Sequence, residues 1–358
     1  MTSTPQAEAR RDAVAEQLFS SVIGALETLH VYVGRELGLY EALDGAPPMT
    51  ADDFAGRAGI APRYAREWLE QQAAAGMIDV AEETGDAATR TFRLPDGVAE
   101  VVCRPDSLAL VSPLAPMVVG VAKALPAVLE AFRSGGGVPY DAYGEDIRRG
   151  IADINRPSFV NQLGAEWIPA LPDLHERLGS GGSIADLGCG EGASTLALAR
   201  AYPRAEVLGL DLDPASIEAA RTAAGELEVT FECRDAADPA LAGSFDLVTL
   251  FETLHDMAHP VQALAAARSM LTPEGAVLVG DEKVADRFAA PGDEMERFNY
   301  GWSALHCLAA AMTEADSAAT GTVIREETVR AYASDAGFGS CTVLPIEHDF
   351  WRFYRLDP

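Results

Sequence analysis

Basic residues are scarce in this chain: 27 Lys and Arg stand against 55 Asp and Glu in 358 residues, a formal net charge of −28. Nucleic acids and anionic membranes are bound largely through Lys and Arg that neutralise phosphate groups, so this composition disfavours both as partners. We therefore expect a small-molecule ligand. The length is sufficient for two domains with separate cores.

Cysteine is also rare, with five residues that are scattered along the chain and form no CxxC pair. Neither a disulfide framework nor a zinc site is indicated, and no metal is expected.

The N-terminus lacks the apolar segment of a signal peptide, which favours a cytoplasmic location. The most apolar stretch, Leu108–Leu129, contains Pro113, Pro116, Lys123 and Pro126, so a buried or interface helix is predicted there rather than a membrane span.

The N-terminal part has the pattern of a winged helix. Apolar residues recur at helical spacing over residues 14–43, and Thr50–Asp53 forms a capping box that opens a short helix. A second helix is predicted from Pro62 to about Ala75, followed by strands at Met77–Val80 and Thr91–Leu94. Helix, turn, helix and β-wing in this order predict a mainly helical winged-helix domain.

Winged helices bind DNA or serve as dimerisation elements, and the local charge discriminates between these roles. The predicted recognition helix carries Arg63 and Arg66 but also Glu67 and Glu70. Across Ala51–Val80, three Arg stand against five Asp and Glu, a net charge of −2. Because phosphate neutralisation dominates DNA affinity, we prefer a structural or dimerising role and expect a homodimer.

From Ser183 onward, strands and helices alternate, which predicts a mostly parallel sheet. Predicted strands are Ser183–Leu187, Glu206–Leu210, Glu228–Cys233, Phe245–Phe251, Ala276–Gly280, Ser340–Ile346 and Phe350–Leu356, the last two as a hairpin, and helices are Ala193–Tyr202, Pro214–Ala224 and Pro260–Leu271. We divide the chain into a winged-helix/dimerisation domain (1–107), a helical connector and active-site cover (108–178) and an α/β domain (179–358).

Three glycines, Gly188, Gly190 and Gly192, make the turn between the first of these strands and the following helix. A strand, a glycine turn and a helix N-terminus in this order bind nucleotides, because small residues let a ligand approach the backbone and free helix N–H groups face the ligand. Asp186 at the strand end would repel a pyrophosphate and attract a cationic amine and a sulfonium. That charge favours S-adenosylmethionine, although the glycine spacing alone also permits NAD.

Further carboxylates follow the next two strands. Asp211 lies 25 residues beyond Asp186, where an acidic residue accepts hydrogen bonds from ribose hydroxyls, and Asp213 competes for this role. Asp235 follows the third strand and can accept a hydrogen bond from an adenine amino group. The carboxyl ends of parallel strands meet at one edge of an open sheet, so these side chains are expected to line one ligand site.

Together, Asp186–Gly192, Gly209–Asp211, Arg234–Ala236 and Phe245–Phe251 resemble the class I S-adenosylmethionine-dependent methyltransferases. The resemblance covers about half the chain, from Ser183 onward, and implies a Rossmann-like seven-stranded, mostly parallel sheet whose last strand is antiparallel. It implies S-adenosyl-L-homocysteine as the product. The cofactor-binding candidates are Asp186, Gly188, Gly190, Asp211 and Asp235, to which we add the neighbouring positions Leu212, Ala236 and Phe251.

The segment Phe251–Met257 is similar to plant-type small-molecule O-methyltransferases, which also carry an N-terminal winged-helix dimerisation domain. That resemblance implies that His255 is the general base and that Asp256 matches the neighbouring acidic position, while Met257 departs from the usual Trp. An imidazole has an ordinary pKa near 6.5 and can accept a hydroxyl proton at neutral pH. Glu282, at the end of the fifth strand, is the third catalytic candidate. Alternatively, His255 only packs at the strand end, and Glu282 is a solvated residue.

Candidate acceptor contacts are the aromatic and polar residues that precede the glycine turn, follow the fourth strand or lie on a helix near residue 302. They are Tyr140, Phe159, Asn161, Glu252, Trp302 and His306. An aromatic helix at this place either belongs to the core or covers an apolar or aromatic acceptor.

The sequence therefore predicts methyl transfer from S-adenosyl-L-methionine to a hydroxyl of a small apolar or aromatic molecule. Two alternatives remain open. One is N- or C-methylation, or a non-methylating cofactor-assisted reaction, on the same scaffold. The other is a winged-helix regulator whose second domain senses a ligand. An NAD dehydrogenase is disfavoured by the charge of Asp186.

Overall fold

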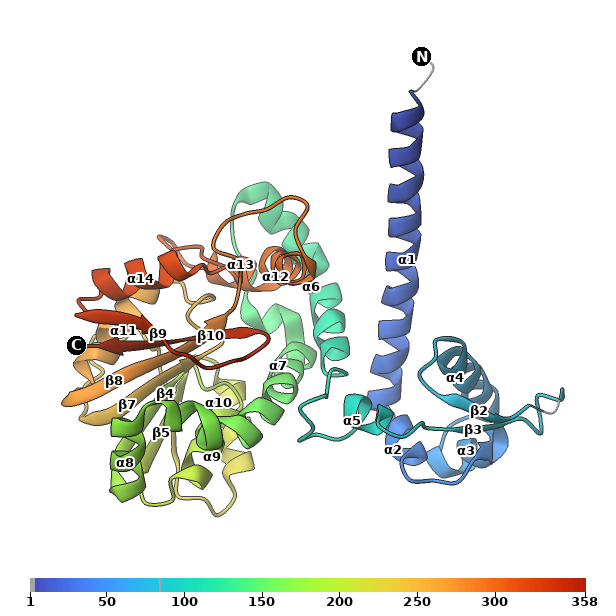
Figure 1. The fold of residues 1–358 in the computed structure, drawn as a ribbon, viewed down its shortest axis with the longest axis horizontal. Coiled ribbons are helices and arrows are strands. Elements are labelled where there is room, and N and C mark those ends of the chain that lie inside the picture. The colour runs from blue at the N-terminus through green and yellow to red at the C-terminus, as the bar shows by residue number, and fades with distance from the viewer. Residues whose placement is uncertain (1–3, 84) are drawn as a thin grey trace. The chain divides into compact units, whose positions relative to one another are not determined.

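The computed structural model describes residues 4–83 and 85–358, and the chain separates into two compact units, Met1–Val119 and Gly120–Pro358 (Figure 1). The elements of the N-terminal unit are α1 (Pro5–Glu36), α2 (Leu39–Leu43), β1 (Met49–Thr50), α3 (Ala51–Ala58), α4 (Pro62–Ala74), β2 (Asp79–Glu82), β3 (Thr91–Arg93) and α5 (Val98–Val102). In the described residues, its three strands pair antiparallel in the order β1-β3-β2.

This arrangement confirms the predicted winged helix. The side chain of Thr50 accepts a hydrogen bond from the Asp53 N–H at 3.2 Å and caps α3, as the capping box predicts. The predicted helix over residues 14–43 is interrupted, because Gly38 adopts φ +63° and separates α1 from α2. Strand β1 is absent from the sequence prediction, since two residues are too short to give an alternating pattern.

Helix α1 contributes only its C-terminal end to the core of the N-terminal unit. Gly34 lies against Tyr40 and Trp68 so closely that a Cβ at this position would meet the Tyr40 ring at 2.5 Å. Most apolar side chains of α1 are instead exposed: Val14, Leu18, Phe19, Val22, Ile23, Leu26, Leu29 and Val33, with Leu37 following the helix. We call these nine residues the exposed α1 face.

Helix α6 (Leu114–Ser134) passes through Pro126 as one continuous helix. Among the described residues it is the one helix long and apolar enough to cross a membrane by length and composition, and 33% of its most apolar window is buried in the protein. Within the C-terminal unit it packs closely, since a Cβ on Gly120 would lie 3.1 Å from Ile147, and Lys123 forms an ion pair with Asp146.

The C-terminal unit is an α/β fold (Figure 1). Its further elements are η1 (Tyr140–Tyr143), α7 (Gly144–Ser158), η2 (Phe159–Trp167), η3 (Ile168–Ala170), α8 (Pro172–Gly181), β4 (Ser183–Leu187), α9 (Ala193–Ala201), β5 (Glu206–Asp211), α10 (Pro214–Ala224), β6 (Thr230–Cys233), β7 (Phe245–Phe251), α11 (Pro260–Ser269), β8 (Leu271–Glu282), α12 (Glu294–Trp302), η4 (Ser303–Cys307), α13 (Leu308–Ala311), α14 (Glu326–Asp335), β9 (Ser340–Val343) and β10 (Trp351–Asp357).

Seven strands of this unit, in the described part of the chain, form one sheet in the order β6-β5-β4-β7-β8-β10-β9. The pairs from β6 to β8 are parallel, and β10 runs antiparallel to both β8 and β9. This confirms the predicted Rossmann-like sheet with an antiparallel last strand. Helices α11 and α14 pack on one face, while η2, α8 and α9 pack on the other. The carboxyl ends of β4, β5, β6 and β7 therefore meet at one edge.

Candidate active site

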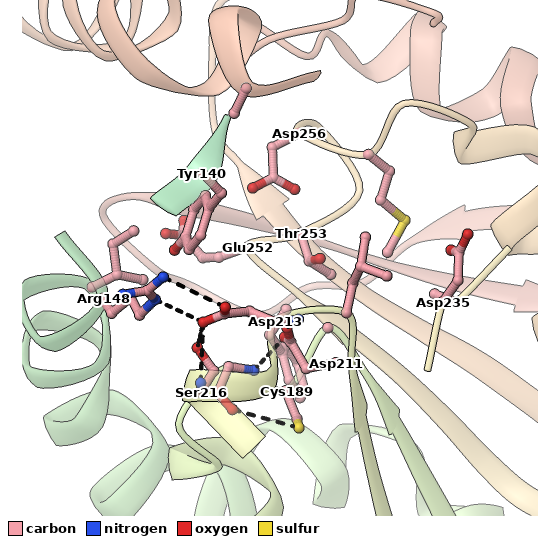
Figure 2. Close-up of a pocket in the computed structure, with 18 of the residues that line it drawn as sticks. Tyr140, Arg148, Cys189, Asp211, Asp213, Ser216, Asp235, Glu252, Thr253 and Asp256 are labelled. Carbon is pink, nitrogen blue, oxygen red and sulfur yellow. Dashed lines mark hydrogen bonds and ion pairs between the residues drawn. The ribbon is translucent and has the colours of Figure 1, made fainter. Parts of the chain in front are cut away.

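A cavity of about 410 Å³ lies at this carboxyl edge, within the ~300–1,000 Å³ typical of small-molecule sites. Figure 2 shows side chains from the strand ends around it, with Tyr140 of η1 and Arg148 of α7 on the covering segments. Ten residues predicted from the sequence as cofactor or acceptor contacts line it: Tyr140, Phe159, Gly188, Gly190, Asp211, Leu212, Asp235, Ala236, Phe251 and Glu252.

The glycine turn is held rigidly against β5. The N–H groups of Gly188 and Cys189 donate to the Leu210 carbonyl at 2.8 and 3.0 Å, and Gly190 N–H donates to the Asp211 carboxylate at 2.8 Å. Gly188 has φ +72°, and a Cβ there would lie 2.2 Å from the Thr253 hydroxyl. Only glycine fits this position, because Thr253 packs directly against its backbone. A Cβ on Gly190 would meet nothing within 4 Å, so the open space for a ligand lies over Gly190.

The Asp211 carboxylate is held in the cavity wall by two backbone N–H groups. Besides the Gly190 N–H it accepts a hydrogen bond from the Asp213 N–H at 2.8 Å. Burial raises the pKa of the Asp211 carboxyl, while these two N–H donors lower it. The side chain lines the cavity, so lone pairs that the protein does not use are available to ligand hydroxyls.

The structure corrects the direct role predicted for Asp186. Its carboxylate is 1% exposed and accepts hydrogen bonds from the hydroxyls of Ser194, Thr195 and Thr249 at 2.6, 2.6 and 2.7 Å. It lies behind the cavity wall, because three hydroxyls from α9 and β7 surround it, and it does not line the cavity. Asp186 therefore joins β4, α9 and β7 and supports the glycine turn from behind.

The charge that selects a ligand is supplied by other residues. Among the described lining residues, seven carry carboxyl groups: Glu191, Asp211, Asp213, Asp235, Glu252, Asp256 and Glu314. The two lining arginines are already paired, Arg148 with Asp213 at 2.7 Å and Arg234 with Asp238 at 2.8 Å. A pyrophosphate would meet carboxylates and no spare arginine, whereas a cationic ligand suits this surface.

His255 forms a buried pair with Asp281, the neighbour of the predicted candidate Glu282 at the end of β8. Its Nδ1 lies 2.6 Å from Asp281 Oδ1, and its backbone N–H donates to the same carboxylate at 3.2 Å. Burial lowers the pKa of His255, but the Asp281 carboxylate outweighs it, so the pKa is raised well above the ordinary value. His255 is 4% exposed and stands behind the wall, while its neighbour Asp256 lines the cavity.

Three further carboxyl groups surround His255. Burial raises the pKa of Glu252 and of Asp256 to about 7 each, although the nearby imidazole of His255 lowers both. Burial and the adjacent Glu252 raise the pKa of Glu282 well above its usual range. Glu252 also adopts φ +56°, a strained backbone conformation for a residue with a side chain, and accepts a hydrogen bond from Asn155 at 3.4 Å. Glu252 and Asp256 can therefore exchange protons near neutral pH.

Three predicted acceptor contacts do not reach the cavity. Asn161 donates its side-chain amide to the Pro157 carbonyl at 2.7 Å, and Trp302 packs against Phe298. His306 lies beneath the wall against the rings of Tyr140 and Tyr143.

Other lining residues were not predicted, including Arg148, Asn155 and the segment Ala310–Glu314. They come from α7, from α13 and from the turn after α13, and helical periodicity does not indicate which face covers a ligand.

Comparison with known proteins gives the same two-part organisation. A family described as a methyltransferase domain matches residues 178–327, and an Rv2258c-like winged HTH domain matches residues 25–104. A ubiquinone biosynthesis O-methyltransferase of Ralstonia nicotianae is 32% identical over 122 residues, which are 33% of this chain and 48% of that protein. The chain spans less than half the length of the first curated relatives it matches, 37% and 48%.

Solved structures resemble nearly the whole chain. The mitomycin 7-O-methyltransferase MmcR gives a TM-score of 0.70 at 20% identity, with 98% of this chain and 99% of that chain covered. Human N-acetylserotonin methyltransferase, solved in complex with S-adenosylmethionine, gives 0.71 at 17% identity, with 96% and 97% covered. At these identities the likeness establishes the shared fold.

Proposed function

Because the chain belongs to the class I S-adenosylmethionine-dependent methyltransferases with an N-terminal winged-helix domain, we propose that it methylates a hydroxyl group of a small apolar or aromatic molecule. The observation that carries the proposal is the cavity at the carboxyl edge, which has an open glycine turn and an excess of carboxylates, with the buried His255–Asp281 pair behind its wall. Several of the similar proteins are O-methyltransferases by name, which supports a hydroxyl acceptor.

The residues present fit the cofactor. Asp211 would accept hydrogen bonds from the ribose hydroxyls, the Gly188–Gly190 backbone would lie against the ligand, and Asp235 and Ala236 would hold the adenine end. When bound, S-adenosylmethionine supplies an electrophilic methyl group attached to a cationic sulfur. The excess of carboxylates in the cavity wall favours that cation.

His255 is the proposed proton acceptor for the acceptor hydroxyl. Asp281 fixes the imidazole through Nδ1 and leaves Nε2 as the basic atom, and it stabilises the imidazolium that forms. The carboxylates near His255 orient the acceptor and exclude an anionic one. The rest of the rate acceleration comes from holding the methyl donor and the acceptor hydroxyl in line.

The test is to incubate the protein with S-adenosylmethionine and a panel of phenols and other hydroxylated aromatic molecules, with matched amines beside them, and to analyse the products by mass spectrometry. We expect a product that has gained one methyl group on oxygen. Methylation of amines alone would favour the N-methylation alternative. Consumption of the cofactor without any methylated product would overturn the proposal.

Asp281→Asn should move the pH dependence of methyl transfer to lower pH. The unprotonated imidazole is the active form, so the rate rises with pH through the pKa of His255, which Asp281 raises. Without the carboxylate, burial dominates and the pKa falls, so the rise occurs at lower pH, and the maximal rate drops because the ring is no longer oriented. The measurement is kcat/KM against pH, with Glu218→Gln on the exposed face of α10 as the control. An unchanged acid limb would contradict this role of Asp281.

The exposed α1 face supports a homodimer. Exposed apolar side chains recur on α1 at spacings of three and four residues through Leu18, Val22, Leu26, Leu29 and Val33, and a stripe of this size marks an interaction surface.

Leu18→Glu combined with Leu26→Glu should therefore convert the dimer to a monomer in light scattering after size exclusion. The double variant Gln17→Glu/Ser20→Glu adds the same charge on the opposite side of α1 and should remain dimeric. A wild-type monomer at micromolar concentration would exclude the dimer.

A cytoplasmic location remains a proposal, supported by five cysteines that are all free thiols.

The regulator alternative predicts DNA binding by the winged helix. Since α4 pairs Arg63 with Glu67, its cationic surface is small, and we expect no shift of random duplex DNA in a low-salt gel.

A further inference from the structure

The covering helix α7 meets the cavity along one face. Its lining residues, at helical spacings of three and four, are Arg148, Ile151, Ala152 and Asn155, with Phe159 at the start of η2 continuing the row. The cover therefore supplies a strip of side chains to the cavity wall. What this strip contributes depends on how α7 is held against the sheet edge.

Arg148 ties this face of α7 to the sheet edge. Its Nε donates to Asp213 Oδ2 at 2.7 Å and its Nη2 to Asp213 Oδ1 at 3.5 Å (Figure 2). The two residues are 65 apart in the sequence, and their side chains are only 14% and 19% exposed. An ion pair shielded to this extent is screened by salt less than a surface pair, and the removal of one partner leaves a poorly solvated charge.

The carboxylate that receives Arg148 is itself fixed. Asp213 caps α10 by accepting hydrogen bonds from the backbone N–H and the hydroxyl of Ser216, at 3.0 and 2.8 Å. Its own backbone N–H donates to Asp211 at 2.8 Å, and Asp211 also accepts from the Gly190 N–H. A continuous chain of contacts therefore runs from the cover, through the proposed ribose acceptor, to the glycine turn.

Arg148 also contacts an aromatic ring of the cover. Its Cζ lies 5.7 Å from the centroid of the Tyr140 ring, within the ~6 Å reach of a cation–π contact. Tyr140 lines the cavity, and its ring lies 5.7 Å from the imidazole of His306. One guanidinium thus touches both the turn that follows β5 and an aromatic part of the cavity wall.

We propose that Arg148 is a positioning residue of the cofactor site: by pairing with Asp213 and lying over Tyr140, it holds the cover on the turn that contains Asp211. Cofactor affinity then depends on a contact that need not touch the cofactor. The inference rests on the proposed function, because it concerns the cavity that is proposed to bind S-adenosylmethionine.

The surroundings of the pair agree with this role. Burial raises the pKa of Asp213, but hydrogen bonds from Ser216 and the charge of Arg148 outweigh burial and lower it, so the carboxylate stays ionised. The other lining arginine, Arg234, pairs with Asp238 four residues further along the chain and connects no distant elements. Of these two arginines, Arg148 is the one that links the cover to the sheet edge.

The test measures binding of S-adenosylhomocysteine, which lacks the sulfonium charge, by titration calorimetry on the full-length protein without an acceptor. Arg148→Met removes the guanidinium but keeps an unbranched side chain. Asp213→Ser removes the carboxylate but keeps a residue that caps a helix N-terminus well. Each variant should weaken binding by about 3- to 30-fold, as expected for residues within one salt-bridge network.

Three results separate this contact from other effects. The two variants change the charge of the cavity in opposite directions, so a general electrostatic effect would strengthen binding in one of them. The double variant should bind no more weakly than Arg148→Met alone, because both side chains act through one contact. Arg148→Lys keeps the charge and should recover most of the affinity.

Arg355→Met is the matched control. Arg355 of β10 forms two hydrogen bonds of 2.8 Å with Asp173 of α8, and neither residue lines the cavity. This variant also breaks an ion pair between distant elements, so it should lower the melting temperature as Arg148→Met does. It should leave the dissociation constant of S-adenosylhomocysteine unchanged.

Wild-type affinity in Arg148→Met, additive losses in the double variant, or an equal loss in Arg355→Met would overturn the inference. If the wild-type protein bound no S-adenosylhomocysteine, the proposed function would fail and the inference with it. If the variants weakened binding as expected but no oxygen-methylated product formed with any acceptor, the inference would stand and the proposed function would fail. If methylation occurred and the affinity did not depend on Arg148, only the inference would fail.

Discussion

Asp211→Ala should abolish measurable binding of S-adenosylmethionine, an affinity loss of at least about 100-fold. In the proposed binding mode the variant removes a half-buried acceptor for the ribose hydroxyls, and each hydrogen bond to a charged group contributes roughly 1.5–3 kcal/mol. It also frees the N–H groups of Gly190 and Asp213, which Asp211 now holds at 2.8 Å, so the glycine turn loses its anchor on β5. Titration calorimetry measures the effect.

The control for this loss is Glu218→Ala, which removes one negative charge from the exposed face of α10 near the same edge. It should bind the cofactor as wild type does. Comparable affinities in Asp211→Ala and wild type would show that the ligand does not lie over the end of β5.

His255→Ala should reduce the turnover number by about 10²–10⁴-fold, the usual contribution of a positioned general base, while cofactor affinity stays unchanged. His255 does not line the cavity and contacts Asp281, whereas Asp211 lines the cavity at the end of β5, so loss of the imidazole should leave the cofactor contacts in place. Single-turnover rates with a methylated product as readout separate the turnover number from the cofactor affinity.

His175→Gln provides the matched histidine control. His175 bonds to the Tyr202 hydroxyl at 2.8 Å outside the cavity, and its replacement should leave turnover near the wild-type value. If His255→Ala turned over at the wild-type rate, another group would be the proton acceptor, and a basic amine would become the favoured acceptor.

The elements that the sequence predicts best are those with a strong local pattern. Strands β4 and β7 have the predicted ends, because their apolar runs are bounded by glycine turns and polar residues. The cavity positions of Asp211 and Asp235 follow from the rule that ligands bind at the carboxyl ends of parallel strands. The segment 108–178 was predicted to cover the site, but the sequence did not indicate that Arg148 and Asn155 would reach the cavity, since tertiary packing decides which face of a helix meets the sheet edge.

Two carboxylates show where the sequence is insufficient. Asp186 lies at the predicted strand end, yet its direction is set by Ser194, Thr195 and the distant Thr249, which only the fold brings together. Asp281 and Glu282 are neighbours on β8, and successive side chains point to opposite faces of a strand. Which of them reaches His255 depends on the register of β8 in the sheet, and the structure selects Asp281.

A cationic ligand is therefore favoured by carboxylates other than Asp186, the residue whose charge first suggested it. Asp186 is satisfied by protein hydroxyls, while the carboxylates of the cavity wall, with both lining arginines already paired, provide the selectivity for a cationic ligand.

Calorimetric titration of the wild-type protein with S-adenosylmethionine and, separately, with NAD⁺ tests this claim most directly. We predict saturable heat for one S-adenosylmethionine per chain and none for NAD⁺. Binding of NAD⁺ without any heat from S-adenosylmethionine would contradict the assignment of the cavity.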